Sequence, residues 1–258
     1  MASAAVASTT GELKRKLREL ALRYPPELVQ RQLKDVERIA FHISLIRKLV
    51  QKENPVIADI GGGVGLFSSG CAALGMKVTL ADDFRDQVNF SFAGVNALAL
   101  HRELGVTVQS CDVIGGLSLP ENHFDAITSF DSMEHWHHSP KKLFHGLIAS
   151  LRQGGWFIVG VPNCVNLRKR ITVPFGIGKW SQFSFWYDQE VFRGHVREPD
   201  VDDLRAIGVD LGLQKVRILG RNWLGYDRPI IRRLLPAFDR ILSLRPSLCA
   251  DIYLVGRK

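Results

Sequence analysis

Short apolar runs alternate with longer amphipathic stretches from residue 55 to residue 161. Five of the runs predict strands, at 56–60, 77–82, 106–110, 124–130 and 155–161. The stretches between them predict helices over 65–75, 86–104 and 140–151. Strands and helices that alternate in this way are typical of βαβ units, which build a parallel sheet with helices on both faces. Because the crossovers are right-handed, the carboxyl ends of the strands share one edge, where ligands bind.

Two predicted helices precede this pattern. A short basic helix over 12–23 ends at a Pro-Pro pair, and a second helix over 27–51 carries apolar residues at helical spacing. We expect residues 1–52 to form an N-terminal helical extension, which either covers a face or edge of the core or acts as a lid over a substrate. Residues 53–258 then form the main domain.

The alternation is interrupted twice after the fifth strand. Residues 163–198 are rich in aromatic side chains, which form either an apolar roof over the substrate or the core of the insertion itself. A second insertion spans 221–248, and its basic, amphipathic segment 228–245 is either solvated or docks on an anionic membrane. The remaining predicted elements are a helix over 200–211 and strands over 215–219 and 251–256.

Composition narrows the class of protein. The chain has 258 residues, is 46% hydrophobic and carries a net charge of +8. These values exclude a disordered or fibrous chain, and the charge favours anionic partners without choosing among nucleic acid, lipid and small substrates. The four cysteines form no CxxC pair, and glycines interrupt the longest apolar stretch, 56–76. We expect a cytoplasmic protein without a secretion signal or membrane helix, peripheral to the membrane if the second insertion docks there.

The strongest motif is a glycine-rich loop, ADIGGGVG at residues 58–65, between the first strand and the first helix of the domain. Glycines allow the backbone to turn sharply and to approach a ligand closely. A dinucleotide-binding loop needs its third glycine where this chain has Leu66, which argues against an NAD-dependent oxidoreductase. The Gly-Lys-Ser/Thr of a phosphate-binding loop is absent, which excludes that class.

Acidic residues stand at the ends of the next two strands. Asp82 follows the start of the loop by about 20 residues, and a carboxylate there can accept hydrogen bonds from two ribose hydroxyls. Asp83 is adjacent and can substitute for it. Asp112 ends the third strand, within reach of an adenine amino group. A single Asp after a strand is ordinary turn chemistry, but the set together with the glycine loop predicts an adenosine site.

These motifs resemble those of the class I S-adenosylmethionine (SAM)-dependent methyltransferases, in the small-molecule branch that includes ubiquinone-pathway O-methyltransferases. The resemblance covers residues 54–220, and the matching stretches are 58–65, 78–83, 110–113, 124–135 and 151–163. It implies an α/β, Rossmann-like sheet of seven mostly parallel strands whose last strand is antiparallel, and it implies SAM as the cofactor.

The resemblance also implies roles for individual residues. Asp59 orients the amino group of SAM, and Asp82 holds the ribose. Asp112 and the Val113 backbone meet the adenine. The remaining cofactor-binding residues are Phe130, whose backbone approaches the methionine amino group, and the loop glycines Gly61, Gly62, Gly63 and Gly65. The pair Asp83-Phe84 departs from the family, which more often has one acid and a small residue here.

Methyl transfer to oxygen also needs a proton acceptor, because the acceptor hydroxyl must lose its proton. The resemblance places His135 near the methyl group, His195 is a second candidate base, and imidazole titrates near neutral pH. The alternative for His135 is a structural role at a helix start, and Glu134 is expected to be structural. His137 and His138 suggest a metal site with His135, but neighbouring loop histidines are usually exposed, so we expect no metal.

The sequence favours a methyltransferase that acts on a small or lipid-linked molecule, at oxygen. Enzymes that methylate base amino groups usually carry an Asn/Asp-Pro-Pro-aromatic run where this chain has Phe-Asp-Ser-Met at 130–133, so nucleic acid is a disfavoured partner. An RNA or protein methyltransferase is supported only by the net charge, and a non-catalytic SAM-binding module is a further alternative. The sequence carries no signal for an oligomeric state.

Overall fold

One seven-stranded sheet organises the chain, in the order β3-β2-β1-β4-β5-β7-β6. The computed structural model describes residues 10–86, 89, 91–178, 183–188, 190–223 and 237–258. The strands are β1 (Val56–Ile60), β2 (Lys77–Asp82), β3 (Thr107–Ser110), β4 (Phe124–Phe130), β5 (Leu151–Pro162), β6 (Gln214–Arg221) and β7 (Asp251–Arg257). Each lies within a few residues of a strand predicted from the sequence.

Strand directions follow the prediction. Strands β1 to β5 pair in parallel, whereas β7 runs antiparallel to both of its neighbours, β5 and β6. The antiparallel last strand is therefore confirmed. The register places Asp59 of β1 between Leu80 of β2 and Thr128 of β4, so polar groups near the ends of these strands lie side by side at one edge.

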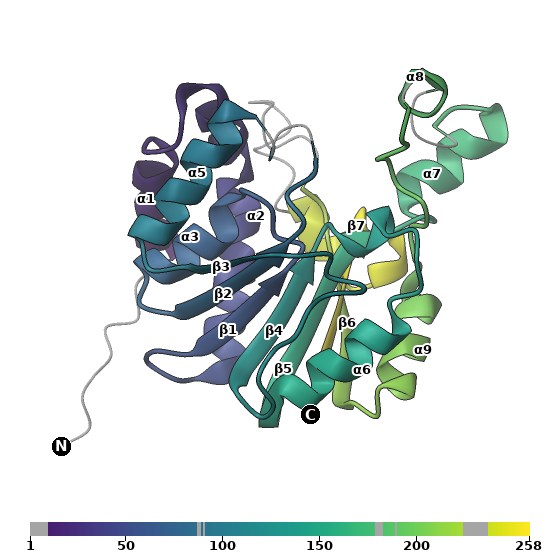
Figure 1. Ribbon diagram of the computed structural model, residues 1–258. Coiled ribbons are helices and arrows are strands. Elements are labelled where there is room, and N and C mark those ends of the chain that lie inside the picture. Colours follow the sequence, from purple (N-terminus) through teal and green to yellow (C-terminus); the bar gives the residue numbers. More distant parts are fainter. Residues whose placement is uncertain (1–9, 87–88, 90, 179–182, 189, 224–236) are drawn as a thin grey trace.

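Helices cover both faces of the sheet (Figure 1). The longer helices are α1 (Thr10–Ala21), α2 (Pro26–Val50), α3 (Leu66–Ala73), α5 (Phe92–Glu103), α6 (Lys141–Ser150) and α9 (Val201–Asp210). Helices α1, α2, α3 and α5 bury one core with residues such as Ile57, while α6 and α9 bury a second core with residues such as Ala58. Adjacent residues of β1 serve opposite cores because side chains alternate along a strand.

The N-terminal helices are part of the main core. The predicted apolar stripe of α2 is buried at Val36, Ala40 and Ile43, and α1 packs against both α2 and α3. The described residues before β1 are therefore mostly helical, and the apolar side of α2 covers one face of the sheet. The opposite side of α2 faces the edge where β1 and β4 end, and it contributes polar residues to a cavity there.

The insertion after β5 stands away from the sheet (Figure 1). It contains α7 (Leu167–Thr172), the 3₁₀ turn η2 (Val173–Phe175) and α8 (Phe183–Tyr187). The side chains of Phe175, Phe183, Trp186 and Tyr187 are each more than half exposed. The interpretation of these aromatics as a core of the insertion is therefore wrong, because elements this short present too little surface to bury them.

The second insertion is described only in part. Residues 224–236, which hold much of the basic segment predicted over 228–245, lie outside the described residues. The short 3₁₀ turn η3 (Pro246–Leu248) leads from this region into β7. Within the described residues, no helix combines the length and the hydrophobicity that crossing a membrane requires.

Helix α9 offers a matched test of the core. Leu204 is fully buried between α9 and the sheet, whereas Val209 of the same helix is 78% exposed. We expect Leu204→Ala to lower the free energy of unfolding by about 2–5 kcal/mol and Val209→Ala to change it by less than about 0.5 kcal/mol. Urea unfolding measures both values. Equal losses in the two variants would contradict the packing of α9.

Candidate active site

The glycine loop folds back onto the end of β2. The backbone N–H of Gly61 donates to the carbonyl of Ala81 at 2.7 Å, and the N–H of Gly63 donates to the Asp82 carboxylate at 2.9 Å. Gly61 has a φ of 73°, and a Cβ built on it would lie 1.8 Å from Ser132 Oγ. Only glycine therefore fits at this position, where the loop also approaches the segment after β4.

Asp59 supports the loop from below. Its carboxylate accepts hydrogen bonds from Ser68 Oγ at 2.7 Å and Thr128 Oγ1 at 3.3 Å, and a Cβ at Gly62 would lie 2.1 Å from it. Burial raises the pKa of Asp59 to about 7, although these hydrogen bonds lower it. The Asp59 side chain is thus held by neighbouring hydroxyl groups, at the floor of the cavity described next.

A cavity of about 760 Å³ opens at the carboxyl ends of β1 to β4. Its size falls in the range of small-molecule and cofactor sites. The structure places every candidate cofactor-binding residue and His135 on its wall, and the residues concerned are Asp59, Gly61, Gly62, Gly63, Gly65, Asp82, Asp83, Asp112, Val113, Phe130 and His135. His195 is outside this lining but packs against His135, with ring centroids 4.8 Å apart.

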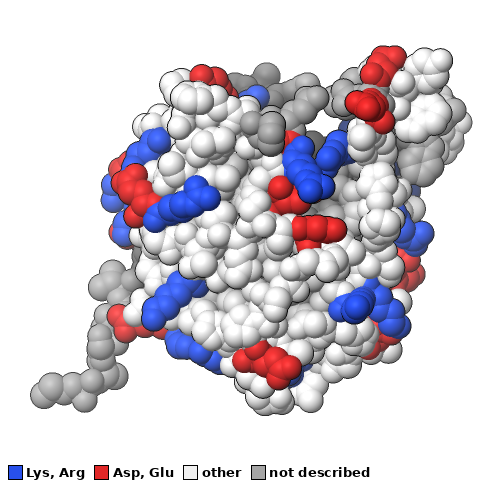
Figure 2. All heavy atoms as spheres, viewed as in Figure 1, with Lys and Arg blue, Asp and Glu red and all other residues white. Residues whose placement is uncertain are grey.

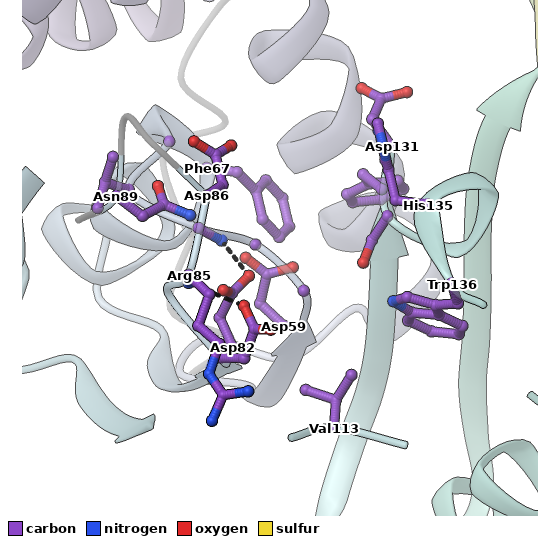
Figure 3. Close-up of a pocket in the computed structure, with 18 of the residues that line it drawn as sticks. Asp59, Phe67, Asp82, Arg85, Asp86, Asn89, Val113, Asp131, His135 and Trp136 are labelled. Carbon is purple, nitrogen blue, oxygen red and sulfur yellow. Dashed lines mark hydrogen bonds between the residues drawn. The ribbon is translucent and has the colours of Figure 1, made fainter. Parts of the chain in front are cut away.

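The two sides of the cavity differ in chemistry, as Figure 3 shows. Asp59 and Asp82 lie on the side of the glycine loop, while Asp131, His135 and Trp136 lie opposite them on the segment after β4. Space-filling atoms show basic and acidic side chains together at the upper centre of this face of the molecule (Figure 2). A ligand that spans the cavity therefore meets a carboxylate-rich wall on one side and imidazole and indole rings on the other.

The acids at the strand ends are not equivalent. Asp82 is buried, and its two carboxylate oxygens accept backbone N–H groups of Gly63 and Phe84. Burial raises the pKa of Asp82, and the same two hydrogen bonds oppose that shift. Asp83 is half-buried, caps the N–H of Arg85, and faces Arg193 at 3.9 Å. Asp112 is exposed, and its carboxylate accepts a hydrogen bond from the backbone N–H of Ile114.

Helix α2 lines the cavity with residues that the sequence analysis did not name as site residues. Arg38 is paired with both Asp131 and Asp35, and these carboxylates raise the pKa of Arg38 although burial lowers it. His42 is buried, and its ring stacks on that of Phe130 with the ring centroids 3.9 Å apart. Burial, with Arg38 nearby, holds the pKa of His42 well below its usual range. In the sequence, Arg38 and His42 were the residues that could have pointed to this wall. A helix face rich in charged residues is, however, normally exposed to solvent.

A strap formed by residues 191–198 crosses the segment after β4. Val196 and Arg197 both donate their backbone N–H groups to the carbonyl of Glu134, at 2.7 and 3.2 Å. Glu134 and His135 belong to the 3₁₀ turn η1 (Met133–His135), and His135 Nδ1 donates to the carbonyl of Arg193 at 2.9 Å. The strap thereby brings His195, 60 positions along the chain, beside His135.

The two histidines after His135 line the same cavity but do not belong to the group of Glu134, His135 and His195. His137 Nε2 is 3.2 Å from the carbonyl of Phe192, and both His137 and His138 are exposed, as expected for neighbouring loop histidines.

A family model described as a methyltransferase domain matches residues 29–218, well over half of the chain. The chain therefore belongs to this family, and the protein is a SAM-dependent methyltransferase with SAM as its cofactor. The matched range begins within α2 and ends within β6, so it includes the whole wall of the cavity.

Solved structures share the fold. A SAM-dependent methyltransferase from Archaeoglobus fulgidus superposes with a TM-score of 0.54 and 17% identity, over 85% of this chain and 94% of that one. Phosphoethanolamine N-methyltransferase 2 of Haemonchus contortus, in complex with SAM, superposes with a TM-score of 0.56 and 16% identity, over 84% of this chain and 52% of that one. A putative sarcosine dimethylglycine methyltransferase from Galdieria sulphuraria superposes with a TM-score of 0.54 and 13% identity, over 96% of this chain and 98% of that one. No curated protein matches the chain.

Gly61 and Gly105 provide a test of the loop. Both have a positive φ, but a Cβ at Gly105 meets no atom within 4 Å, whereas one at Gly61 collides with Ser132. We expect Gly105→Ala to cost about 1 kcal/mol of stability from backbone strain alone and to leave SAM affinity unchanged. Gly61→Ala is expected to lose at least tenfold in SAM affinity, measured by calorimetry. Normal SAM affinity in Gly61→Ala would contradict this geometry.

Proposed function

We propose that the protein transfers the methyl group of SAM to an oxygen atom of a small or lipid-linked acceptor. The observation that carries this proposal is the two-sided cavity, in which one wall suits an adenosine and the opposite wall, at Asp131, His135 and Trp136, is free for a second molecule. The acceptor enters between α2 and the strap at 191–198. Helix α2 and the strap together form the walls of the acceptor side.

The residues on the glycine-loop side fit SAM. Each Asp82 oxygen already accepts one backbone N–H, and a carboxylate offers about four lone-pair directions in total, so both oxygens retain one for a ribose hydroxyl. Val113 is buried and the adjacent Asp112 is exposed, and we assign the adenine to this part of the cavity. The glycines leave room for the methionine part. When bound, SAM supplies a methyl group on a positively charged sulfur, which the carboxylates around the cavity favour.

The acceptor side provides positioning and a place for the proton. Holding two reactants in line is worth several kcal/mol of the barrier, and the strap, α2 and Trp136 fix the walls of that space. The His135 ring reaches the cavity, with burial and the adjacent His195 lowering its pKa. The base role of His135 and His195 stays a prediction.

The exposed aromatics of the first insertion support a lipid-linked acceptor. Phe183, Trp186 and Tyr187 lie on α8, and the neighbouring α7 carries Arg168, Lys169 and Arg170. Exposed apolar groups beside basic ones are typical of segments that rest in the interface of an anionic membrane. We therefore propose that this insertion, rather than the cavity wall, is where the protein touches a membrane.

Ribose binding is tested by comparing two adjacent acids. Asp82→Asn removes the carboxylate that accepts hydrogen bonds from two backbone N–H groups and, in this proposal, from the ribose hydroxyls. Hydrogen bonds to charged groups are worth about 1.5–3 kcal/mol. We expect at least tenfold weaker binding of S-adenosylhomocysteine by calorimetry. Asp83→Asn, at a half-buried side chain that faces Arg193, is expected to change affinity less than threefold. The reverse order would transfer the ribose role to Asp83.

Membrane contact is tested with vesicles. We expect the full chain to sediment with phosphatidylglycerol vesicles more than with phosphatidylcholine vesicles, and the double variant Phe183→Ser/Trp186→Ser to lose most of that binding. Phe92→Ser removes an aromatic at the start of α5 that is even more exposed, and it serves as the control. Unchanged binding in the double variant would overturn the docking role of α8.

The acceptor atom is tested by the product. Methyl-labelled SAM is incubated with hydroxylated and amine-bearing candidate acceptors, both water-soluble and lipid-linked. Label in a methyl ether supports the proposal, and label only in a methylated amine contradicts its oxygen acceptor.

A further inference from the structure

The strap assembles three metal-ligating side chains that the sequence interpretation did not combine. One ligand atom each of Glu134, His135 and His195 lies within 4.8 Å of the other two. Among the residues that the structure describes, this is the one group of three or more such side chains with that spacing. We propose that Glu134, His135 and His195 form a binding site for one divalent first-row transition-metal cation beside the acceptor space.

Glu134 supplies the observation that points to a ligand. Its side chain is 1% exposed, and its Oε2 has no hydrogen-bond partner among the described residues. A buried carboxylate oxygen without a partner is costly, and a bound cation removes that cost. The backbone carbonyl of Glu134 is held by two N–H groups of the strap, so the residue is fixed in place although its carboxylate oxygen is not paired.

The two histidines are oriented as metal ligands are. His135 Nδ1 donates to the carbonyl of Arg193 at 2.9 Å, and His195 Nδ1 lies 2.7 Å from a carboxylate oxygen of Glu198. A ligating histidine almost always directs its second nitrogen to such an oxygen, which leaves Nε2 with the lone pair for the cation. Glu198 is itself paired with Lys169, so this supporting carboxylate is fixed as well.

The three ligand atoms lie farther apart than in an occupied site. Ligand atoms about 2.0–2.2 Å from one cation in tetrahedral geometry are about 3.3–3.6 Å from one another, so the observed limit of 4.8 Å requires side-chain rotations that close the group by about 1 Å. His195 belongs to the strap, outside any helix or strand, and can make that change. Two imidazoles and one carboxylate suit Mn²⁺, Fe²⁺, Co²⁺ or Zn²⁺, and they leave coordination positions open.

The inference rests on the proposed function, because it gives the acceptor side a Lewis acid. His135 lines the cavity, so a cation bound to it lies beside the acceptor space. A cation beside a hydroxyl lowers the pKa of that hydroxyl, and the proton then passes to solvent. Under this assignment His135 and His195 are ligands, and neither needs to act as the base.

Metal binding is tested with Co²⁺ alone on the full chain after treatment with a chelator. We expect about one Co²⁺ per chain by equilibrium dialysis, with visible absorption bands from nitrogen and oxygen ligands. His195→Ala and Glu134→Gln are each expected to weaken Co²⁺ binding at least tenfold. His145→Ala is the control, because His145 of α6 is also paired with a carboxylate, that of Asp210, but lies on the surface; it is expected to bind Co²⁺ normally.

A milder variant protects the test against misfolding. Glu198→Gln keeps the size of the side chain that orients His195, and loss of such a supporting group typically weakens metal affinity by about 10–100-fold. S-Adenosylhomocysteine binding in the presence of chelator reports that each variant is folded. If the unaltered chain binds S-adenosylhomocysteine but no Co²⁺, or if Co²⁺ affinity is the same in all four variants, the metal site is overturned while the proposed function stands. Absence of methyl transfer in chains that bind Co²⁺ overturns the proposed function alone.

Discussion

The hydrogen bond from the Gly63 backbone to the Asp82 carboxylate is the contact on which the site depends. It joins the loop after β1 to the end of β2, and the bond from Gly61 to Ala81 reinforces it. Together they fix the loop at the carboxyl edge of the sheet, above the Asp59 side chain. Because the loop follows β1 and Asp82 ends the neighbouring parallel strand β2, the topology of the sheet positions the glycine loop at the cavity.

The acceptor side is built on a different principle. Its groups come from α2, the turn after β4 and the strap at 191–198, which are far apart in the sequence and are joined by side-chain and backbone hydrogen bonds. Such a wall depends on insertions rather than on the sheet, so it can differ between proteins that share the fold. For this reason the fold identifies SAM as the cofactor but does not identify the methyl acceptor. The acceptor has to be inferred from the side chains of this wall.

The sequence predicted the sheet and the glycine-loop side well, because both depend on local pattern. Strand β1 was predicted at 56–60 and Asp82 at a strand end, and the structure agrees. The pairing of Arg38 with Asp131 and the meeting of Glu134 with His195 depend on tertiary contacts over long separations, which no periodicity encodes. For the aromatics at 175–187 the sequence leaves two interpretations open, since composition shows that a segment is apolar but cannot show whether anything covers it.

The most direct test of this account is a crystal structure of the protein with S-adenosylhomocysteine. The account predicts the adenosine in the 760 Å³ cavity, with its ribose hydroxyls within hydrogen-bond distance of Asp82 and its sulfur directed toward His135. A ligand bound elsewhere, or one whose ribose lies away from Asp82 while the sulfur points out of the acceptor space, would contradict it.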